Sequence, residues 1–540
     1  MKRIFLHIKT ALGIAFLWSV ALSCTDEILD EVNKDNSHPQ SVDAKYILAD
    51  VITSTAFSNR GGDLNTYLAT YVEHETGIDN QLWRAETRSG EPTVASTFNN
   101  NWSNLYTTLK DARIALAQCS AGGIQEGNDV TKGIAEVLAA YNSALITDFF
   151  GDVPWSEAAL IDETGSPLNM TPKIDKQEDI YKGIFALLDA AIADLQKADI
   201  KTIGSYDLLY GGDADKWIKF AYGLKARYTM RLLKTVAEAN RPAEYDKVLE
   251  YIAKSFTSAD EQAAFAIYDA NNLNPLFDFQ WSRDGLAASQ SLAEKLIARN
   301  DPRLRRVFVD AGWVQVSDTA TTVVQDDGTV EEKEVGIYFP APNGDPRQEK
   351  YVYNTSTFVY SQTAPTLLLS YHELLFLKAE ALERKSDASA KDVLKAAVIA
   401  GIANTEVNVA AAFSAPTVLG YGGLEETTDA IDEDEAANYF DTEVAPLYDA
   451  NPLQEIMVQK YLAFFGASGE SPEAYNDIRR LKALGENHIE LKNSKNADGK
   501  FPLRCPYGND DTTTNPAVQA AYGNGQYVYT ENVWWAGGTR

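Results

Sequence analysis

Two histidine–glutamate pairs are the first candidates for chemistry in this chain of 540 residues. His74-Glu75 and His372-Glu373 each begin as a zinc-protease motif does. That motif needs a second histidine four residues after the first, so that two imidazoles on one helix face bind one metal ion. The positions hold Ile78 and Phe376 instead, so neither pair predicts a zinc site.

Other catalytic patterns are also incomplete. Ser468 lacks the glycine two residues later that a nucleophile elbow needs, and no glycine-rich phosphate loop occurs. Asp432 to Asp434 begins like a calcium loop, but Ala436 and Ala437 stand where a third ligand and the turn glycine belong. The 77 acidic residues make any pair of carboxylates uninformative about glycoside hydrolysis. We therefore expect a binding protein and not an enzyme, with no cofactor and no metal.

The charge balance restricts the partners. The chain has 48 basic and 77 acidic residues, and an export signal over residues 1–23 would remove three basic ones, which leaves a charge of about −32. Such a charge repels phosphate backbones and anionic headgroups, so we expect no nucleic acid and no direct binding to a membrane surface. A neutral or cationic ligand, or another protein, is the expected partner.

Residues 1–23 have the pattern of an export signal. Lys2, Arg3 and Lys9 precede a largely apolar run that is too short to span a membrane. The run ends in a small residue followed by Cys24, which resembles a lipobox and predicts lipidation of that thiol. A plain secretory signal with an incidental cysteine is the alternative. Residues 24–40 are polar and are expected to form a flexible tether.

The rest of the chain should contain no membrane span, because no later run approaches 18 apolar residues. Its two remaining cysteines, Cys119 and Cys505, are expected to be isolated, partly buried thiols, although one disulfide stays possible.

Apolar residues spaced by three and four dominate residues 41–540 and predict amphipathic helices. The clearest stripes run over 102–116, 134–149, 180–195, 217–228, 371–382 and 456–464. We expect one mainly α-helical domain, an array of tetratricopeptide-like hairpins with long irregular insertions and short β segments. The insertions are expected at 271–290, 310–365, 405–450 and the last 40 residues, the last as an ordered loop. The second should contain short β runs at 313–316, 335–339 and 351–358. Binding surfaces tend to lie on such insertions.

One dense segment suggests a family. Residues 148–157 contain Asp148, Gly151-Asp152-Val153-Pro154 and Glu157, which resembles the signature of SusD/RagB nutrient-binding lipoproteins. Further segments similar to that family follow in the same order along the chain, at 216–231, 370–381, 456–480 and 504–507. The chain is therefore identified as a member of the SusD-like subgroup of this family.

The signatures themselves are interpreted as structural. Residues 148–157 are expected to form a rigid corner. Trp217, Phe220 and two arginine pairs, Arg227 with Arg231 and Arg479 with Arg480, are expected to pack in the core or to clamp carboxylates.

The resemblance implies a function. Its members are surface-exposed outer-membrane lipoproteins that capture an oligosaccharide, or in some cases a peptide, for a partner SusC-like TonB-dependent transporter. They present helical hairpins to the transporter and a less regular face to the ligand. Contact with the membrane would then be through the lipid anchor only.

Two loops combine the groups that bind sugars, namely aromatic faces and hydrogen-bonding side chains. The resemblance places ligand contacts in the corresponding regions. The candidate ligand-binding residues are Asn80, Trp83, Arg84, Phe277, Asp278, Trp281 and Arg283. The alternatives are that Trp83 and Trp281 only anchor their loops, that the ligand is a peptide, that the scaffold is a surface glycosidase or peptidase, or that it stabilises the transporter without binding a nutrient.

Overall fold

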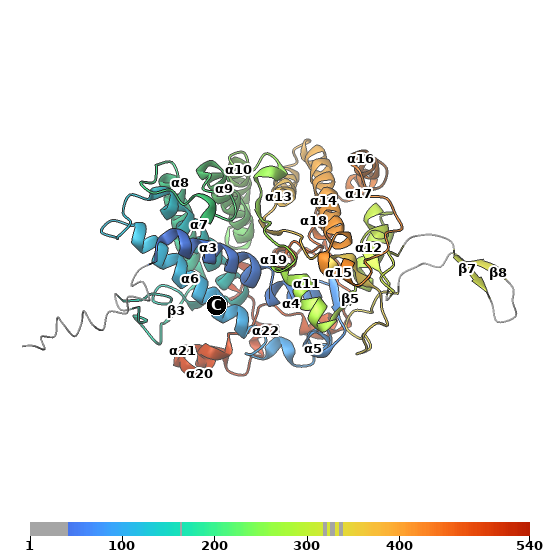
Figure 1. The fold of residues 1–540 in the computed structure, drawn as a ribbon, viewed down its shortest axis with the longest axis horizontal. Helices are drawn as coiled ribbons and strands as arrows, with labels where there is room; N and C mark the ends of the chain where they lie inside the picture. Colours follow the sequence, from blue (N-terminus) through green and yellow to red (C-terminus); the bar gives the residue numbers. More distant parts are fainter. Residues whose placement is uncertain (1–41, 163–164, 311, 317–320, 325–329, 334–338) are drawn as a thin grey trace, which may run out of the picture. The chain divides into compact units, whose positions relative to one another are not determined.

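Pairs of consecutive helices that pack on each other make up most of the protein (Figure 1). The computed structural model describes residues 42–162, 165–310, 312–316, 321–324, 330–333 and 339–540. The long helices are α6 (Asn99–Cys119), α7 (Asp129–Phe150), α8 (Gln177–Asp194), α9 (Ala214–Arg231), α10 (Arg241–Ile252), α13 (Tyr371–Arg384), α14 (Ala390–Phe413), α18 (Pro452–Ala463) and α19 (Ser471–Leu484). All six stripes predicted from the sequence lie in or along these helices, and the mainly α-helical class is confirmed.

Shorter helices connect and cover the long ones. They are α3 (Ala44–Ser54), α4 (Asp63–Tyr71), α5 (Asn80–Glu86), α11 (Pro275–Arg283), α12 (Gln290–Ile297), α15 (Pro416–Gly420), α16 (Glu433–Tyr439), α17 (Ala445–Ala450), α20 (Asn509–Thr514), α21 (Pro516–Tyr522) and α22 (Tyr527–Thr530), with a π-helical turn η1 (Thr55–Arg60) after α3. Residues 44–540 form one compact unit.

The strands are short and pair two by two, all antiparallel. They are β1 (Glu75–Gly77) with β5 (Leu286–Ala288), β2 (Val153–Pro154) with β3 (Ile174–Asp175), β4 (Ala263–Phe265) with β10 (Thr366–Leu369), β6 (Phe308–Val309) with β9 (Thr355–Ser356), and β7 (Thr321–Val324) with β8 (Val330–Lys333). The predicted β runs at 313–316 and 351–358 are only partly right, because β9 alone is a strand there and 314–315 form isolated bridges. The third predicted run, at 335–339, falls almost wholly outside the described residues.

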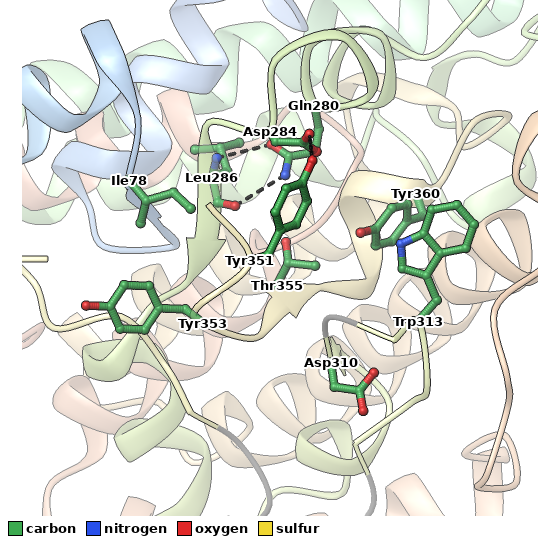
Figure 2. A pocket seen from close by; sticks show the side chains of 10 residues that line it. All are labelled: Ile78, Gln280, Asp284, Leu286, Asp310, Trp313, Tyr351, Tyr353, Thr355 and Tyr360. Carbon is green, nitrogen blue, oxygen red and sulfur yellow. Dashed lines mark hydrogen bonds between the residues drawn. The ribbon is translucent and has the colours of Figure 1, made fainter. Parts of the chain in front are cut away.

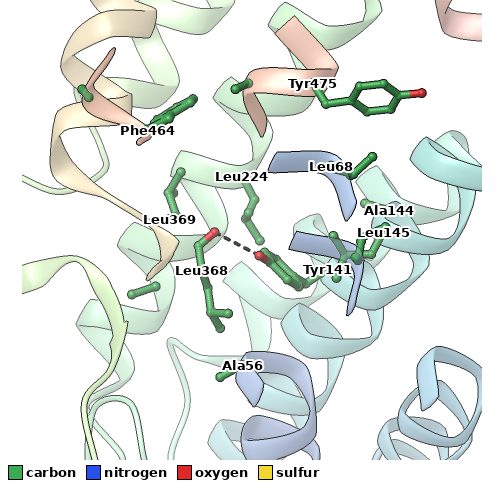
Figure 3. Packing of buried hydrophobic residues seen from close by; sticks show 14 of the residues in the cluster. Ala56, Leu68, Tyr141, Ala144, Leu145, Leu224, Leu368, Leu369, Phe464 and Tyr475 are labelled. Carbon is green, nitrogen blue, oxygen red and sulfur yellow. Dashed lines mark hydrogen bonds between the residues drawn. The ribbon is translucent and has the colours of Figure 1, made fainter. Parts of the chain in front are cut away.

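The core joins helices from distant parts of the sequence. Tyr141 of α7 lies beside Leu224 of α9, and its hydroxyl donates to the carbonyl of Leu368 in β10 at 3.1 Å (Figure 3). All three side chains are buried, so the hydroxyl's partner is supplied inside the core. Strand β10, which is late in the sequence, is thereby linked to the earlier helix α7 inside the core.

A buried ionic network fixes the signature residues. Glu473 of α19 pairs with Arg231 and with Arg60, and Arg231 also pairs with Asp148. Arg227 holds Glu373 at 2.6 Å, which confirms the predicted clamps. Buried charges cost stability unless they are paired, and each of these has a partner.

The second arginine pair splits into two roles. Arg480 clamps Glu380 at 2.7 Å, as predicted. Arg479 instead donates to the carbonyl of Asp148 at 2.8 Å and lies over the ring of Tyr475. Both are buried and structural.

The corner at 148–157 is also structural. Gly151 ends α7 with φ 78°, and the Asp152 carboxylate accepts from the amide of Gln177 at 2.8 Å. Cys119 and Cys505 are buried free thiols.

Three predicted insertions contain helices that the sequence analysis did not predict. Residues 271–290 include α11, 405–450 include the end of α14 with α15 to α17, and the last 40 residues include α20 to α22. Helices α11 and α21 begin at Asn-Pro pairs, where the side chain of Asn274 or Asn515 caps the first turn and the proline needs no hydrogen-bond partner. These local caps explain helices too short to show apolar periodicity.

Residues 390–420 lie in the part of the chain for which the sequence predicted no membrane span. By length and composition this stretch could cross a membrane, but half of its most apolar window is buried inside the protein. It packs on α13 and α18, so we interpret it as a core helix. The predicted signal at 1–23, Cys24 and the tether at 24–40 lie outside the described residues.

Candidate ligand-binding site

The β1–β5 ribbon brings the two predicted ligand segments together. Its antiparallel register pairs Glu75 with Ala288 and Gly77 with Leu286. The residues that follow β1 therefore meet the residues that precede β5, and the amide of Ile78 donates to the carbonyl of Gly285 at 2.9 Å. Helix α5 begins three residues after β1 ends, and helix α11 ends three residues before β5 begins.

The first segment is a helix and not the expected loop, and its side chains are engaged locally. Arg84 pairs with Glu91 at 3.0 Å and donates to the side chain of Asn80 at 3.0 Å. The indole N–H of Trp83 donates to the carbonyl of Pro346 at 3.0 Å. Trp83 therefore anchors the segment around residue 346, while Asn80 is exposed at the start of α5.

The second segment is also a helix, and it carries one side of an aromatic cluster. Phe277 is fully buried and stacks on Trp281, with ring centroids 5.4 Å apart. Trp281 in turn contacts Trp313 at 5.9 Å and Tyr421 at 5.5 Å. We call Trp281, Trp313 and Tyr421 the aromatic platform. Tyr421 is 74% exposed, so the platform reaches solvent.

The other two candidates on α11 lie apart from this platform. Arg283 is exposed and its guanidinium lies over Phe279. Asp278 is exposed and lines a different hollow. The structure thus gathers Phe277 and Trp281 and separates them from Asp278.

A small hollow adjoins the platform (Figure 2). It is lined by Ile78, Gln280, Asp284, Leu286, Asp310, Trp313, Tyr351, Tyr353, Thr355 and Tyr360, and we call it the aromatic hollow. Its volume of about 30 Å³ accommodates only a few water molecules. A ligand larger than a few water molecules would therefore lie on the rim of the hollow and on the platform, with single groups pointing into the hollow.

Three of the residues lining the aromatic hollow have an unusual backbone. Asp284, Trp313 and Tyr351 have φ values of 49°, 65° and 63°. Positive φ costs energy for residues other than glycine and is most unusual for bulky ones, and such conformations cluster at functional sites. Three such residues line one hollow, which makes it a candidate functional site.

Hydrogen bonds hold these residues in place. The Asp310 carboxylate accepts from the amides of Gly312 and Val314, at 2.8 and 2.9 Å, and so fixes the turn that presents Trp313. The hydroxyl of Tyr351 donates to Asp284 at 2.5 Å across the mouth of the hollow (Figure 2). That hydrogen bond raises the pKa of Tyr351, and burial raises the pKa of Tyr360, so both hydroxyls stay neutral near pH 7.

The arrangement has features that suit the recognition of a flat, partly apolar ligand. Indole and phenol rings offer flat apolar faces, and the carboxylates and hydroxyls among the lining residues offer hydrogen bonds, whereas the Gln280 side chain is already bonded to the backbone of Leu286. Within the described residues, no group of three or more histidine, cysteine or acidic side chains is placed to hold a metal ion. Sugars present the complementary pair of features, an apolar C–H face and a ring of hydroxyls.

The sequence analysis missed most of the residues that line the aromatic hollow. Trp313 and Tyr351 were noted only as the first residues of β-type runs, and Tyr360 and Tyr421 were not singled out. The sequence Asp310-Ala-Gly-Trp313 is the one local indication of this site, because Asp and Gly favour turns and a turn presents the tryptophan that follows it.

Comparison with known proteins identifies the family. The family model described as "Starch-binding associating with outer membrane" matches residues 39–508. A solved SusD/RagB family protein from Bacteroides thetaiotaomicron is 54% identical, with 93% of this chain and 100% of that chain covered and a TM-score of 0.84. The chain belongs to the SusD-like family. The recognition made from the sequence is confirmed.

More distant SusD-like structures share the fold. One described as a chitin-binding protein is 24% identical, covers 91% of this chain and 99% of its own, and has a TM-score of 0.68. A chitin-binding SusD homologue from Flavobacterium johnsoniae is 18% identical, covers 91% and 98%, and has a TM-score of 0.62. The comparison with curated proteins gave no match. This SusD-like chain is thus a member of a nutrient- and glycan-binding family associated with the outer membrane.

Proposed function

We propose that this SusD-like protein captures an oligosaccharide on its aromatic platform and passes it to a partner TonB-dependent transporter. It acts at the cell surface, held in the outer membrane by a lipid on Cys24, and it binds the glycan without cleaving it. The family membership supports the general role, and the aromatic hollow supports the class of ligand.

The observation that carries the proposal is the presentation of Trp313. The Asp310 turn holds this indole at positive φ beside Trp281 and Tyr360, with ring centroids 5.9 and 5.8 Å away. Holding a bulky side chain there costs folding energy that packing alone does not require. A stacking surface for a flat, partly apolar ligand accounts for that cost.

A glycan fits the aromatic hollow better than a peptide does. A peptide backbone binds by forming hydrogen bonds with an exposed strand edge or by filling deep side-chain pockets. The aromatic hollow has a volume of only about 30 Å³, and aromatic rings and single polar groups line it (Figure 2). The carboxylate of Asp284 and the hydroxyl of Thr355, which has no hydrogen-bond partner among the described residues, line the hollow as polar groups for the hydroxyls of a sugar.

The test is a binding screen with the full-length protein, by calorimetry, against defined oligosaccharides and a peptide pool. Chitooligosaccharides come first because two proteins of the same fold are described as chitin-binding. We expect saturable binding of at least one oligosaccharide class and no change in the recovered sugar by chromatography. Release of shortened products would contradict the non-catalytic role, and binding of peptides alone would contradict the ligand class.

A further inference from the structure

A second hollow lies on the other side of helix α11. Gln280 of this helix lines the aromatic hollow, whereas Asp278, about 200° away around the helix axis, lines the second hollow. The second hollow has a volume of about 260 Å³ and is lined by Thr53, Phe57, Phe265, Ile267, Tyr268, Asn271, Asn272, Leu273 and Asp278. That volume is close to the lower end of ordinary small-molecule sites.

The walls of the second hollow are apolar and partly open to solvent. Phe57 is 37% exposed and Ile267 is 47% exposed, although both are large apolar residues. Phe57 belongs to the π-helical turn η1, and π-helical turns occur frequently at functional sites. Exposed apolar side chains that face one concavity mark a binding site more often than side chains scattered singly.

Hydrogen bonds keep the second hollow open without a ligand. The Asp269 carboxylate accepts from the amides of Asn271 and Asn272, at 2.7 and 2.8 Å, and so fixes the loop on one side. The hydroxyl of Tyr268 shares a hydrogen bond of 2.8 Å with Thr366 of β10. A ligand would therefore enter a preformed site and would have few groups to order.

The charged group of the second hollow accepts hydrogen bonds and donates none, and two of its other polar groups already donate within the protein. The hydroxyl of Thr53 already donates to the carbonyl of Ala49 at 2.8 Å, and the amide of Asn272 donates to Asp269 at 3.2 Å. Asp278 is the only charged residue that lines it, and its carboxylate makes no hydrogen bond or ion pair with any described residue. The carboxylate of Asp278 is therefore a negatively charged hydrogen-bond acceptor in a hollow that aromatic residues also line.

We propose that the second hollow is a binding site for an organic cation with an apolar body, an ammonium or guanidinium group carried on an alkyl or aromatic stem. Such groups donate hydrogen bonds and accept none, which matches a site whose charge is an unpaired carboxylate. The aromatic residues Phe57 and Tyr268 line the same hollow, and aromatic rings attract cations, while the apolar residues of the lining suit an apolar stem. A sugar fits less well, because it has no positive charge to pair with the carboxylate. The proposal is independent of glycan capture.

The test uses three probes with one common body: phenethylammonium, 2-phenylethanol and phenylacetate. Saturation-transfer NMR with the full-length protein measures the dissociation constant of each. We expect phenethylammonium to bind most tightly, phenylethanol more weakly and phenylacetate not at all. Added salt should weaken the binding of phenethylammonium and leave phenylethanol unchanged.

Substitutions test whether the probes bind in the second hollow. Asp278→Asn should weaken phenethylammonium about two- to fivefold and leave phenylethanol unchanged. Asp179→Asn, on the exposed face of α8, is the matched control and should have no effect. Phe57→Ala should weaken both probes, and Trp313→Ala neither. Equal affinity for ammonium and alcohol in the wild type, or an Asp278→Asn protein that still prefers the ammonium, would overturn the proposal whether or not a glycan binds.

Discussion

At the residue scale, an incompletely paired carboxyl lies behind the aromatic hollow. Glu75 of β1 is buried, its Oε1 accepts from the Ser356 hydroxyl at 2.5 Å, and its Oε2 has no hydrogen-bond partner. Burial raises the pKa of Glu75 to about 8. The side chain is therefore neutral over most of the physiological range, and its proton is part of the folded structure.

Because the pKa of Glu75 is higher in the folded protein than in the unfolded chain, the stability of the protein depends on pH. Between about pH 4.5 and pH 8 the folded protein keeps a proton on Glu75 that the unfolded chain releases, so the free energy of unfolding falls as pH rises. This contribution to stability is complete below the pKa of Glu75 in the unfolded chain. It is lost as the pH rises through the pKa of Glu75 in the folded protein. Glu75→Gln keeps an acceptor for Ser356 and removes the titration.

We expect Glu75→Gln to match the wild type at pH 4.5 and to be more stable at pH 8 by more than about 1 kcal/mol. Urea unfolding at both pH values measures the difference. A variant with the same pH dependence as the wild type would show that Glu75 does not hold a proton in the folded state.

At the element scale, α19 is held in the protein by the ionic network around Glu473. Three arginines from η1 and α9 converge on this one carboxylate. Opposing positive charge holds the pKa of Glu473 well below its usual range despite burial. Removing the carboxylate leaves those guanidinium groups without their shared partner in the core.

Glu473→Gln should lower the free energy of unfolding by about 3–5 kcal/mol, measured by urea denaturation. The control is Asp449→Asn, which removes the partner of Lys391 in an exposed ion pair and should cost less than about 1 kcal/mol. Equal losses in the two variants would contradict the assignment of Glu473 as a buried centre of charge.

The corner after α7 depends on a single glycine. Gly151 has φ 78° and ψ −133°, and a Cβ there would lie 2.3 Å from the guanidinium of Arg504. That guanidinium donates to the carbonyl of Phe150, so it cannot move without losing a hydrogen bond.

Gly151→Ala should therefore destabilise the protein by at least about 1–3 kcal/mol. Gly523→Ala is the matched control: Gly523 follows α21 at φ 57° and ψ −105°, but its added Cβ meets open space. Thermal unfolding of the two variants separates backbone strain from the clash. If Gly523→Ala cost as much as Gly151→Ala, the close approach of Arg504 would play no part.

The elements also show how far sequence reasoning reaches. Long helices such as α7 and α8 were predictable because one apolar stripe repeats over several turns. Helix α11 was missed because it has nine residues and its aromatic side chains face a local cluster, although Asn274-Pro275 marked its start. Of the residues at the aromatic platform, Phe277 and Trp281 were among the candidates named from the sequence, whereas Trp313 and Tyr421 join it from distant segments. No local pattern encodes that meeting.

At the scale of the whole molecule, capture needs a protein held beside its transporter. Cys24 lies outside the described residues, and its lipidation remains a prediction from the sequence. Cys24→Ser should move the protein from the membrane fraction to the soluble fraction and leave ligand affinity unchanged, because the site lies within residues 78–421. Fractionation followed by calorimetry tests both statements. An unchanged membrane fraction would exclude Cys24 as the anchor.

The central claim is that the platform around Trp313 holds the glycan. Calorimetry with the best oligosaccharide from the screen should show Trp313→Ala binding at least about tenfold more weakly, because one stacking face is lost. Tyr206→Ala, an exposed aromatic residue outside the lining of the aromatic hollow, should bind like the wild type. Circular dichroism confirms that both variants are folded. Wild-type affinity in a folded Trp313→Ala protein would contradict the account.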